Sequence, residues 1–455
     1  MSPPEAKSPN IFQASKIEEI DQALSPRPLR EDELDNFWIE TDEQRDPHIN
    51  VRERLLTELS RPGSPKVMLY GHMGCGKSTE LVKFQSQHGG KFTFVSFSLL
   101  KEAMLSQANV PALLLLICER VVDYAKRAEL EFDEEAMKGV LDWFKNTFEI
   151  SEEEWKGSAG ADSEVSAKSP SFFNFFQFTG RLQSSIKASR NYLRRTEDAH
   201  PQRLAHLSLH TGTVIREFNE ALRKAGKNPP VIVIEDLDKL AFGENAKLFM
   251  NDPAPLAELP CRFIYVTPIN LLSSARASSL GNHYTLVSFP MIHVVSKDGK
   301  PDREGGIKKV RAILAKRMDL SLIDDDALEA AIEKTGGVLR QLFEVISHAG
   351  SSTLNLWKRA PEGELKIQKA NVEYGLDQVR KRLLAQVSTT GADPEFLKAN
   401  SITQESLKAR LREVGTGSVD GIGKVEDQIL LEAQALLEYN GSGYKRVHPL
   451  LLNAL

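Results

Sequence analysis

Five short apolar runs recur along the first two thirds of the chain, and segments with helical periodicity separate them. The runs cover residues 66–70 (KVMLY), 91–99 (KFTFVSFSL), 231–234 (VIVI), 263–267 (FIYVT) and 284–289 (YTLVSF). Their β-branched and aromatic residues favour strands, and the four β-branched residues at 231–234 are typical of a strand buried on both faces of a parallel sheet. Strands that alternate with helices predict an α/β core of three layers, which ends near Pro290.

Beyond Pro290 the spacing of apolar residues becomes helical. The predicted helices cover residues 307–318, 326–334, 338–349, 372–386, 404–414 and 425–438. Gly350 directly follows the third of these helices and fits a helix C-terminus. The run 439–444 (YNGSGY) predicts a hairpin turn, and together with the last three helices it outlines a winged helix.

Residues 71–78 (GHMGCGKS) match the phosphate-binding pattern G-x-x-x-x-G-K-[ST] between a predicted strand and a predicted helix at about 77–87. A loop that turns its backbone N–H groups toward phosphates needs unusual dihedral angles, which favours glycine. The glycines are Gly71, Gly74 and Gly76. Lys77 would reach the β- and γ-phosphates of ATP, and the Ser78 hydroxyl would ligate Mg²⁺.

Two more residues belong to the predicted nucleotide-binding segment. Cys75 lies inside the loop at a position that the pattern leaves free, and Thr79 is the hydroxyl next to Ser78 and a weaker candidate. The alternative for the whole segment is a glycine-rich turn that fits the pattern by coincidence.

The apolar run 231–234 ends in acidic residues, namely Glu235, Asp236 and Asp238. Because ligands of parallel sheets bind at the carboxyl ends of the strands, we expect these side chains beside the P-loop. One carboxylate would hold Mg²⁺ through water and the next would polarise the attacking water. The order of the residues leaves open whether Glu235 or Asp236 takes the metal, and Asp238 is a third carboxylate or a cap of the next helix. Lys77, Glu235 and Asp236 are therefore candidate catalytic residues.

The chain resembles the AAA+ and STAND group of P-loop ATPases, which includes nucleotide-switch ATPases of bacterial signalling and defence systems. The resemblance covers roughly residues 36–350. It rests on the P-loop, on VIVIEDLDKL (231–240), on FIYVTP (263–268) and on TGGVLRQLF (335–343). The closing segment 436–455 is similar to that of stand-alone bacterial members of this group.

The resemblance implies three further site residues. Thr267 would be a first sensor that touches the γ-phosphate or the lytic water, although it also fits an ordinary strand end. Arg340, on a lid helix, would be a second sensor that pairs with the γ-phosphate and reports hydrolysis as a lid movement; the alternative is a solvated surface arginine. Arg276 would be an arginine finger that acts on a neighbouring copy.

Composition and motifs predict four regions. Residues 1–35, with prolines among charges, predict a flexible N-terminal arm, and residues 36–290 form the α/β core. A helical lid at 291–365 and a winged-helix-like domain at 366–455 follow. A polar, Gly- and Ser-rich stretch predicts an insertion at about 150–182, whose phenylalanines would form either a patch for partner binding or self-association, or a small core.

The net charge of −5 over 455 residues gives no global electrostatic attraction to nucleic acid. Cys75, Cys118 and Cys261 are too few and too widely spaced for a disulfide framework or a zinc site, so a reducing cytoplasm is the expected location. No stretch reaches the roughly 18 apolar residues of a membrane span.

Two functions fit these motifs. The first is a regulatory switch that binds and hydrolyses ATP with Mg²⁺ and acts on a partner effector protein or through homo-oligomerisation. The second is an AAA+ nucleic-acid ATPase of initiator or transposition-regulator type. Its phosphate contacts would be Arg380, Lys381, Arg382, Lys445 and Arg446. A scaffold that binds nucleotide without turnover is a third possibility, against which the intact Lys77 and Ser78 argue.

Overall fold

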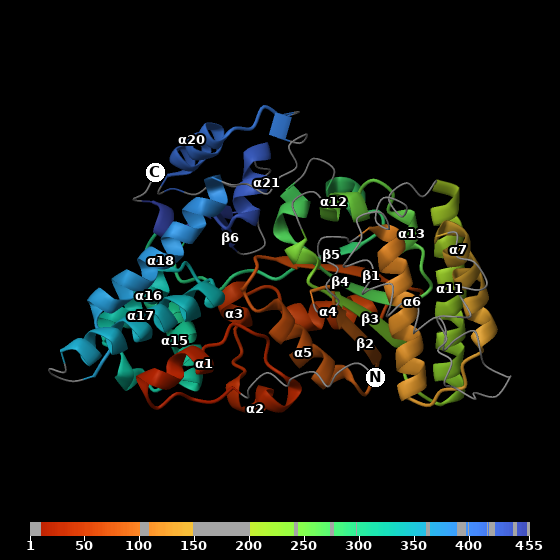
Figure 1. Ribbon diagram of the computed structural model, residues 1–455, viewed down its shortest axis with the longest axis horizontal. Coiled ribbons are helices and arrows are strands. Elements are labelled where there is room, and N and C mark those ends of the chain that lie inside the picture. Colours follow the sequence, from red (N-terminus) through yellow and green to blue (C-terminus); the bar gives the residue numbers. More distant parts are fainter. Residues whose placement is uncertain are drawn as a thin grey trace.

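The centre of the protein is a five-stranded parallel sheet, seen in the computed structural model of Figure 1. The structure describes residues 11–100, 109–148, 201–240, 244–273, 277–296, 298–360, 365–388, 397–398, 400–415, 417, 424–439 and 444–452. The strands are β1 (Lys66–Gly71), β2 (Thr93–Ser98), β3 (Pro230–Glu235), β4 (Arg262–Pro268) and β5 (Thr285–Ser288), in the order β2-β3-β4-β1-β5. All four pairings are parallel, which confirms the predicted α/β fold with a P-loop NTPase core.

Strand order brings the candidate site together. β1 lies between β4 and β5, and Tyr70 of β1 is in register with Thr267 of β4 and Ser288 of β5. β3 is the other neighbour of β4. The carboxyl ends of β1, β3 and β4 therefore meet at one edge of the sheet, as expected for a parallel α/β sheet with a ligand site.

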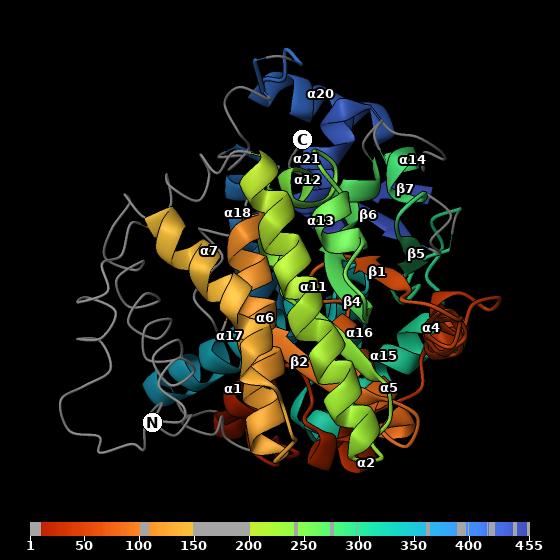
Figure 2. The same cartoon turned by 90° about the vertical axis from the view of Figure 1, so that its right-hand side faces the viewer.

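Alternate residues of the strands build two separate apolar layers. On one face, Met68, Ile232 and Tyr265 pack against helices α6 (Val110–Arg127), α7 (Lys138–Phe148) and α11 (Pro201–Lys224). On the other face, Leu69, Val233 and Ile264 pack against α4 (Val51–Leu59) and α5 (Lys77–His88). Figure 2 shows α6 and α11 side by side over the sheet. Both faces of the sheet are thus covered, which explains the continuous apolar run in β3.

Short helices connect these elements. They are α3 (Asp42–Arg45), η3 (Glu134–Met137), η4 (Leu237–Lys239), α12 (Glu244–Phe249), α13 (Ala254–Ala257), η5 (Ile269–Ser273) and α14 (Ala277–Leu280). The helix α6 begins with a side-chain cap, because the Asn109 side chain accepts a hydrogen bond from the Ala112 N–H at 2.9 Å and Pro111 occupies the first turn. The predicted insertion and its phenylalanines lie outside the described residues.

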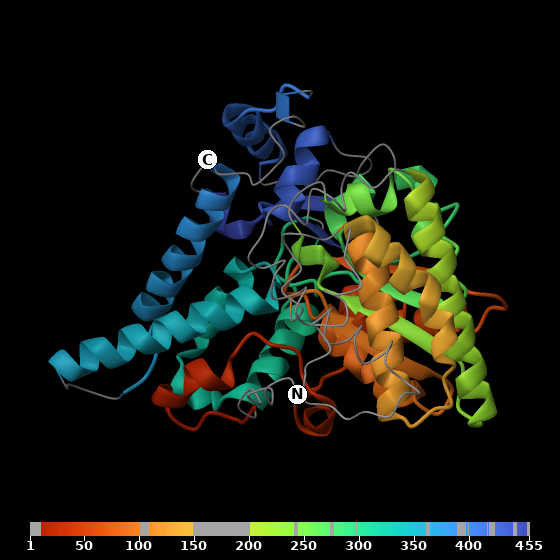
Figure 3. The ribbon, with the colours of Figure 1, turned by 45° about the vertical axis from the view of Figure 1, so that its right-hand side comes forward.

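A group of helices follows the core, as Figure 3 shows, and we call residues 303–359 the lid after their predicted role. It consists of the π-helical turn η6 (Arg303–Ile307), α15 (Lys308–Arg317), η7 (Leu320–Leu322), α16 (Asp325–Lys334) and α17 (Leu339–Arg359). The predicted end of a helix at Gly350 is wrong, because α17 continues to Arg359. Gly350 instead lies inside α17 where Ile17 packs against it: a Cβ at this position would be 3.5 Å from the Ile17 Cγ2.

The prediction of a flexible arm is wrong for residues 11–35, which pack onto the lid and the core. They contain η1 (Ile17–Glu19), α1 (Ile20–Ala23), η2 (Glu31–Glu33) and the start of α2 (Leu34–Phe37). The Ala14 N–H donates to the Arg317 carbonyl at 2.8 Å, and Ile17 and Ile20 are buried beside α17. Ile17, Ile20 and Leu24 have the apolar spacing of a helix-packing face. The prediction missed this spacing because prolines and charged residues dominate the composition of the segment.

The C-terminal region supplies α18 (Lys369–Ser388), α20 (Gln404–Val414), α21 (Val425–Glu432), a two-stranded antiparallel sheet of β6 (Leu436–Tyr439) and β7 (Tyr444–Val447), and η8 (Pro449–Leu451). The predicted helix over 425–438 is too long, since Gln434 has a φ of 55° and the chain then enters β6. The hairpin prediction is confirmed by the pairing of β6 and β7. The winged-helix domain itself stays a prediction.

Two expectations from composition can be compared with the described residues. All three cysteines are free and buried. Within the described ranges, no helix combines the length and the apolar character that a bilayer span requires.

The packing of α1 on the lid predicts a stability effect. Ile20→Ala removes a fully buried side chain from the interface with α17, and we expect it to lower the free energy of unfolding by about 2–5 kcal/mol. Urea denaturation measures this. Gln22→Ala is the matched control, because Gln22 is exposed on the same helix. Equal effects of the two substitutions would show that this segment does not contribute to the folded core.

Candidate nucleotide-binding site

The P-loop joins β1 to α5, and its glycines are required by close contacts. Gly74 and Gly76 have φ angles of 77° and 110°, which favour glycine. A Cβ on Gly74 would lie 2.6 Å from the Cβ of Arg340, and one on Gly71 would lie 2.5 Å from the Phe289 carbonyl oxygen. The loop is therefore enclosed by the lid on one side and by the end of β5 on another.

Lys77 begins α5 and is buried between the loop and the acidic end of β3. Its Nζ donates to the carbonyl oxygens of Gly71 at 2.9 Å and His72 at 2.8 Å, and forms an ion pair with the Asp238 Oδ2 at 2.7 Å. Burial alone would lower the pKa of Lys77, but the Asp238 carboxylate outweighs this and raises it. Asp238, the third carboxylate of residues 235–238, is thus the partner of Lys77.

Ser78 and Glu235 are in contact, as a magnesium site of the predicted kind requires. The Ser78 hydroxyl lies beside the Glu235 carboxyl and acts to lower its pKa. Burial, with Asp236 and Asp238 nearby, raises the pKa of Glu235 to about 7. A hydroxyl beside a carboxylate is a donor set of hard oxygens that suits Mg²⁺, and a cation would favour the ionised carboxylate.

Asp236 has a different environment. Its backbone is left-handed, with a φ of 68°. The carboxylate accepts a hydrogen bond from the Ser98 hydroxyl of β2 and pairs with the Lys239 Nζ at 2.5 Å. An L-residue held in this conformation at a strand end is strained, which is a common feature of functional sites. Glu235 and Asp236, adjacent in sequence, therefore contact different groups.

Thr267 lies at the end of β4 with its hydroxyl buried. The residue is 1% exposed, and its Oγ1 has no hydrogen-bond partner among the described residues. Leaving a buried hydroxyl unpaired costs about 1–3 kcal/mol, so the position suits a group that awaits a ligand. The register beside Tyr70 places Thr267 next to the strand that leads into the P-loop.

Arg340 follows the N-terminus of α17 and lies directly against the P-loop. Its backbone N–H donates to the Gly74 carbonyl at 3.3 Å, and its Cβ limits the space at Gly74. Arg340 is also among the charges that act on the pKa of Lys77. Arg340 therefore lies beside the P-loop, and its role as a sensor of the γ-phosphate stays a prediction. Arg276 lies outside the described residues.

Cys75 and Thr79 both accept hydrogen bonds from the N-terminal part of the chain. The Cys75 carbonyl accepts a hydrogen bond from the Arg45 Nη2 at 2.8 Å, and the Thr79 hydroxyl accepts one from the Leu29 N–H at 3.2 Å. Neither contact was expected, since residues 29 and 45 precede the motif and carry no pattern of their own.

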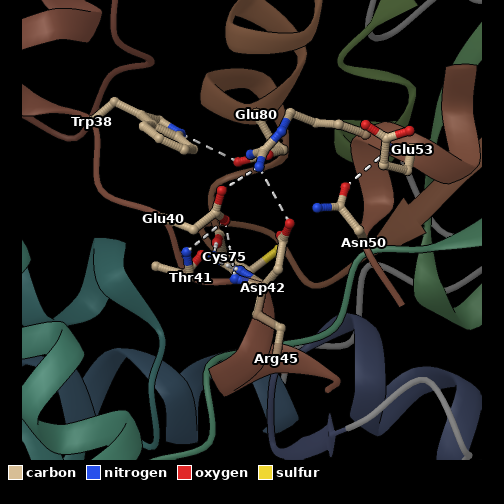
Figure 4. Close-up of polar contacts among 10 residues, drawn as sticks. Trp38, Glu40, Thr41, Asp42, Arg45, Asn50, Glu53, Cys75 and Glu80 are labelled. Carbon is tan, nitrogen blue, oxygen red and sulfur yellow. Dashed lines mark hydrogen bonds and ion pairs between the residues drawn. The ribbon is translucent and has the colours of Figure 1, made fainter. Parts of the chain in front are cut away.

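An ion cluster lies next to these contacts (Figure 4). Arg52 of α4 pairs with Glu40, Asp42 and Glu80, the last of which belongs to α5. Burial and the neighbouring Glu40 raise the pKa of Asp42 to about 6. The guanidinium of Arg52 also lies over the Trp38 ring, 4.9 Å from its centroid. This cluster fastens residues 38–42 to α5.

Asn270, just beyond β4, is a further polar residue whose role the sequence did not indicate. Its Nδ2 donates to the Glu432 Oε2 of α21 at 2.5 Å, and its Oδ1 has no partner in the described part of the chain. Glu432 lines a small cavity together with Gly71 and Asp238. The C-terminal region therefore reaches the edge of the sheet where the P-loop and the acidic residues meet.

The parallel sheet, the P-loop after its β1 strand and the acidic end of β3 define a P-loop NTPase core. No protein-family model matches the sequence, and a search of curated proteins found no match. Similar solved structures include a Walker-type ATPase of Pyrococcus abyssi, with 12% identity, a TM-score of 0.46 and coverage of 94% of this chain and 98% of that one.

Two other solved structures are similar. Orc1 of Aeropyrum pernix, solved in complex with DNA, has 12% identity, a TM-score of 0.37 and coverage of 96% and 97%. RuvB of Thermotoga maritima has 12% identity, a TM-score of 0.34 and coverage of 91% and 96%. These values are too low to support a conclusion about function.

The buried Glu432 predicts a pH effect on stability. Burial raises its pKa to about 8, well above the roughly 4.3 of an exposed glutamate. The folded state thus binds a proton that the unfolded state releases, so this contribution to stability is full at low pH and is lost as the pH rises through 8.

Urea denaturation at pH 5.5, 7 and 8.5 measures this effect. Glu432→Gln stays neutral at every pH, and we expect its stability to fall less than that of the wild type between pH 5.5 and 8.5. Glu426→Gln, a change at a partly exposed position on the same helix, should retain the wild-type slope. Parallel slopes in wild type and Glu432→Gln would contradict the assignment.

Proposed function

We propose that the chain is a Mg²⁺-dependent ATPase whose nucleotide state controls the position of the lid and the C-terminal region. The supporting observation is that both regions contact the P-loop itself. The Gln434 Nε2 donates to the Met73 carbonyl at 2.6 Å, and the Glu438 N–H donates to the His72 Nε2 at 2.8 Å. A change in the conformation of the loop would therefore directly alter its hydrogen bonds to the C-terminal region.

The lid joins the same network. The Gln341 Nε2 donates to the Gln434 Oε1 at 3.0 Å, and the Gln341 Oε1 lies 2.6 Å from the His448 Nε2. The Leu450 N–H donates to the His448 Nδ1, so the ring proton is on Nε2 and points to Gln341. Burial lowers the pKa of His448 to about 3, so its ring stays neutral. Gln341 follows Arg340, which links the proposed γ-phosphate sensor to the C-terminal region.

His72 completes this network from inside the loop. It accepts the Glu438 N–H through Nε2, so its ring proton is on Nδ1. Burial, with Lys77 next to it, lowers the pKa of His72 to about 3. A neutral histidine at a free position of the motif thus serves as an acceptor for the hairpin.

The residues of the site would divide the work as follows. Backbone N–H groups of the loop bind the phosphates of ATP, and Lys77 exchanges Asp238 for the β- and γ-phosphates. Ser78 and Glu235 would hold Mg²⁺, which neutralises phosphate charge when bound. Asp236 is the remaining carboxylate that can orient water, and the orphan Thr267 hydroxyl and Arg340 would contact the γ-phosphate.

The output that we propose is self-assembly or control of a partner protein in the cytoplasm. Switches of the AAA+ and STAND type in bacterial signalling and defence, which the motifs resemble, act in this way. The contacts of lid and hairpin with the loop support such a switch, because loss of the γ-phosphate would remove charge from the loop to which both are bonded.

The nucleic-acid alternative has less support. Lys445 is 3% exposed and lies 3.7 Å from the buried Asp427, so it is not available to a phosphate in this arrangement. Arg380 and Lys381 both pair with Asp377, and Arg382 pairs with Glu344. Duplex-DNA binding at two salt concentrations tests this alternative, since phosphate contacts make affinity salt-dependent.

Loss of Lys77 tests the proposed activity. Lys77→Ala should reduce Mg²⁺-dependent ATP turnover by at least about a hundredfold, because it removes the buried ammonium and leaves Asp238 unpaired. Phosphate release measures turnover. Lys83→Ala on the same helix is the control and should retain activity. Wild-type turnover in Lys77→Ala would rule out the assigned site.

The contact between Gln434 and Met73 tests the switch. Gln434→Ala removes the bonds to the loop and to Gln341, and we expect faster amide hydrogen exchange in residues 72–77 and in the hairpin without ATP. Glu426→Ala on α21 is the control. Exchange that matches the wild type in both segments would show that the hairpin does not restrain the loop.

A further inference from the structure

The guanidinium of Arg45 is buried against the P-loop although no motif contains this residue. Its Nε donates to the Thr41 Oγ1 at 2.8 Å, its Nη1 to the Pro290 carbonyl at 2.5 Å and its Nη2 to the Cys75 carbonyl at 2.8 Å. Figure 4 shows Arg45 below the carboxylates of the ion cluster, close to Cys75. All three acceptors are neutral.

A buried cation without a carboxylate in direct contact is costly. Burial lowers the pKa of Arg45, and Glu80 and Asp42 oppose this only from a distance. Those two carboxylates pair with Arg52. The three hydrogen bonds use three of the five N–H donors of the guanidinium. Arg45 therefore retains positive charge and donor capacity that its protein partners do not fully use.

The charge lies where the phosphate-binding helix begins. The Nη2 of Arg45 would be 3.5 Å from a Cβ on Gly76, the residue that caps α5. The guanidinium stacks on Phe289, 4.1 Å from the ring centroid. Lys77 at the end of the same loop and Arg340 of the lid also contact it, so three cationic residues lie at the loop.

Arg45 also connects the loop to the point where the lid begins. Pro290 directly follows the stacked Phe289, which comes after the end of β5, and the His293 N–H donates to the Gln44 carbonyl at 2.8 Å. The segment from 41 to 45 is thus bonded on one side to the P-loop and on the other to the chain that enters the lid.

We propose that Arg45 is a positioning residue of the nucleotide site, which fixes the Cys75–Gly76 peptide against the start of the lid and favours polyphosphate binding through its charge. This inference rests on the proposed function. The ligand class is a nucleoside triphosphate, whose phosphates supply the negative charge that the buried guanidinium lacks. Only the fixing of the Cys75–Gly76 peptide requires a guanidinium, since a lysine at this position could keep the charge but not the three directed bonds.

Two substitutions separate charge from packing. Arg45→Met should weaken binding of ATP and of inorganic tripolyphosphate by about tenfold to a hundredfold, the loss expected for one charge-assisted interaction. Arg45→Lys keeps the charge, so tripolyphosphate affinity should stay within about threefold of the wild type, while kcat for ATP falls because the loop is no longer fixed to the lid. Titration calorimetry and phosphate release measure these quantities.

Arg317→Met is the matched control. Arg317 is also buried, donates to a backbone carbonyl and lies over Phe37 and Phe343, but it belongs to α15. This variant should lose stability and retain ATP affinity. If Arg45→Met does not fold, Arg45→Gln replaces it as the neutral variant.

Three results would overturn the inference. If the neutral variant binds ATP as the wild type does, Arg45 does not act on the site. If the lysine variant and the neutral variant lose the same tripolyphosphate affinity, Arg45 acts through packing alone. If the wild-type protein binds neither ATP nor tripolyphosphate, the proposed function itself is wrong. The first two results, in contrast, contradict only the role of Arg45.

Discussion

The buried ammonium of Lys77 is the interaction on which the site depends. It holds the carbonyl oxygens of Gly71 and His72 on one side and the Asp238 carboxylate on the other. These bonds tie the end of β1 to the end of β3, although β4 lies between the two strands. Because the ammonium is buried away from water, the loss of any of its partners raises the free energy of the site unless a phosphate takes that partner's place.

Three distant parts of the chain converge on the loop that Lys77 closes. Arg45 comes from the segment before the core and Arg340 from the lid, and Gln434 and Glu438 come from the C-terminal region. Most of these contacts are hydrogen bonds to loop carbonyls rather than apolar packing. Directed bonds of this kind depend on the path of the loop backbone, which is the part of the site that a bound nucleotide contacts first.

The sequence predicted the sheet and the motif residues, because β-branched runs and the P-loop spacing are local signals. It did not predict that Arg45 would contact Cys75, since two residues thirty positions apart carry no shared periodicity. The burial of residues 11–35 was missed because composition hid the spacing of Ile17 and Ile20. The different contacts of Glu235 and Asp236 also depend on the backbone turn at Asp236, which no residue pattern indicates.

The N-terminal segment has a consequence for the range of lid motion. Ala14 is bonded to Arg317 and Asp319 of the lid region, whereas Leu29 is bonded to Thr79 beside the P-loop. The residues between Ala14 and Leu29 have a fixed number and connect the lid region to the P-loop region. A lid that rotates must keep within the reach of this segment or release one of its ends, so the first part of the chain limits how far the lid can move away from the core.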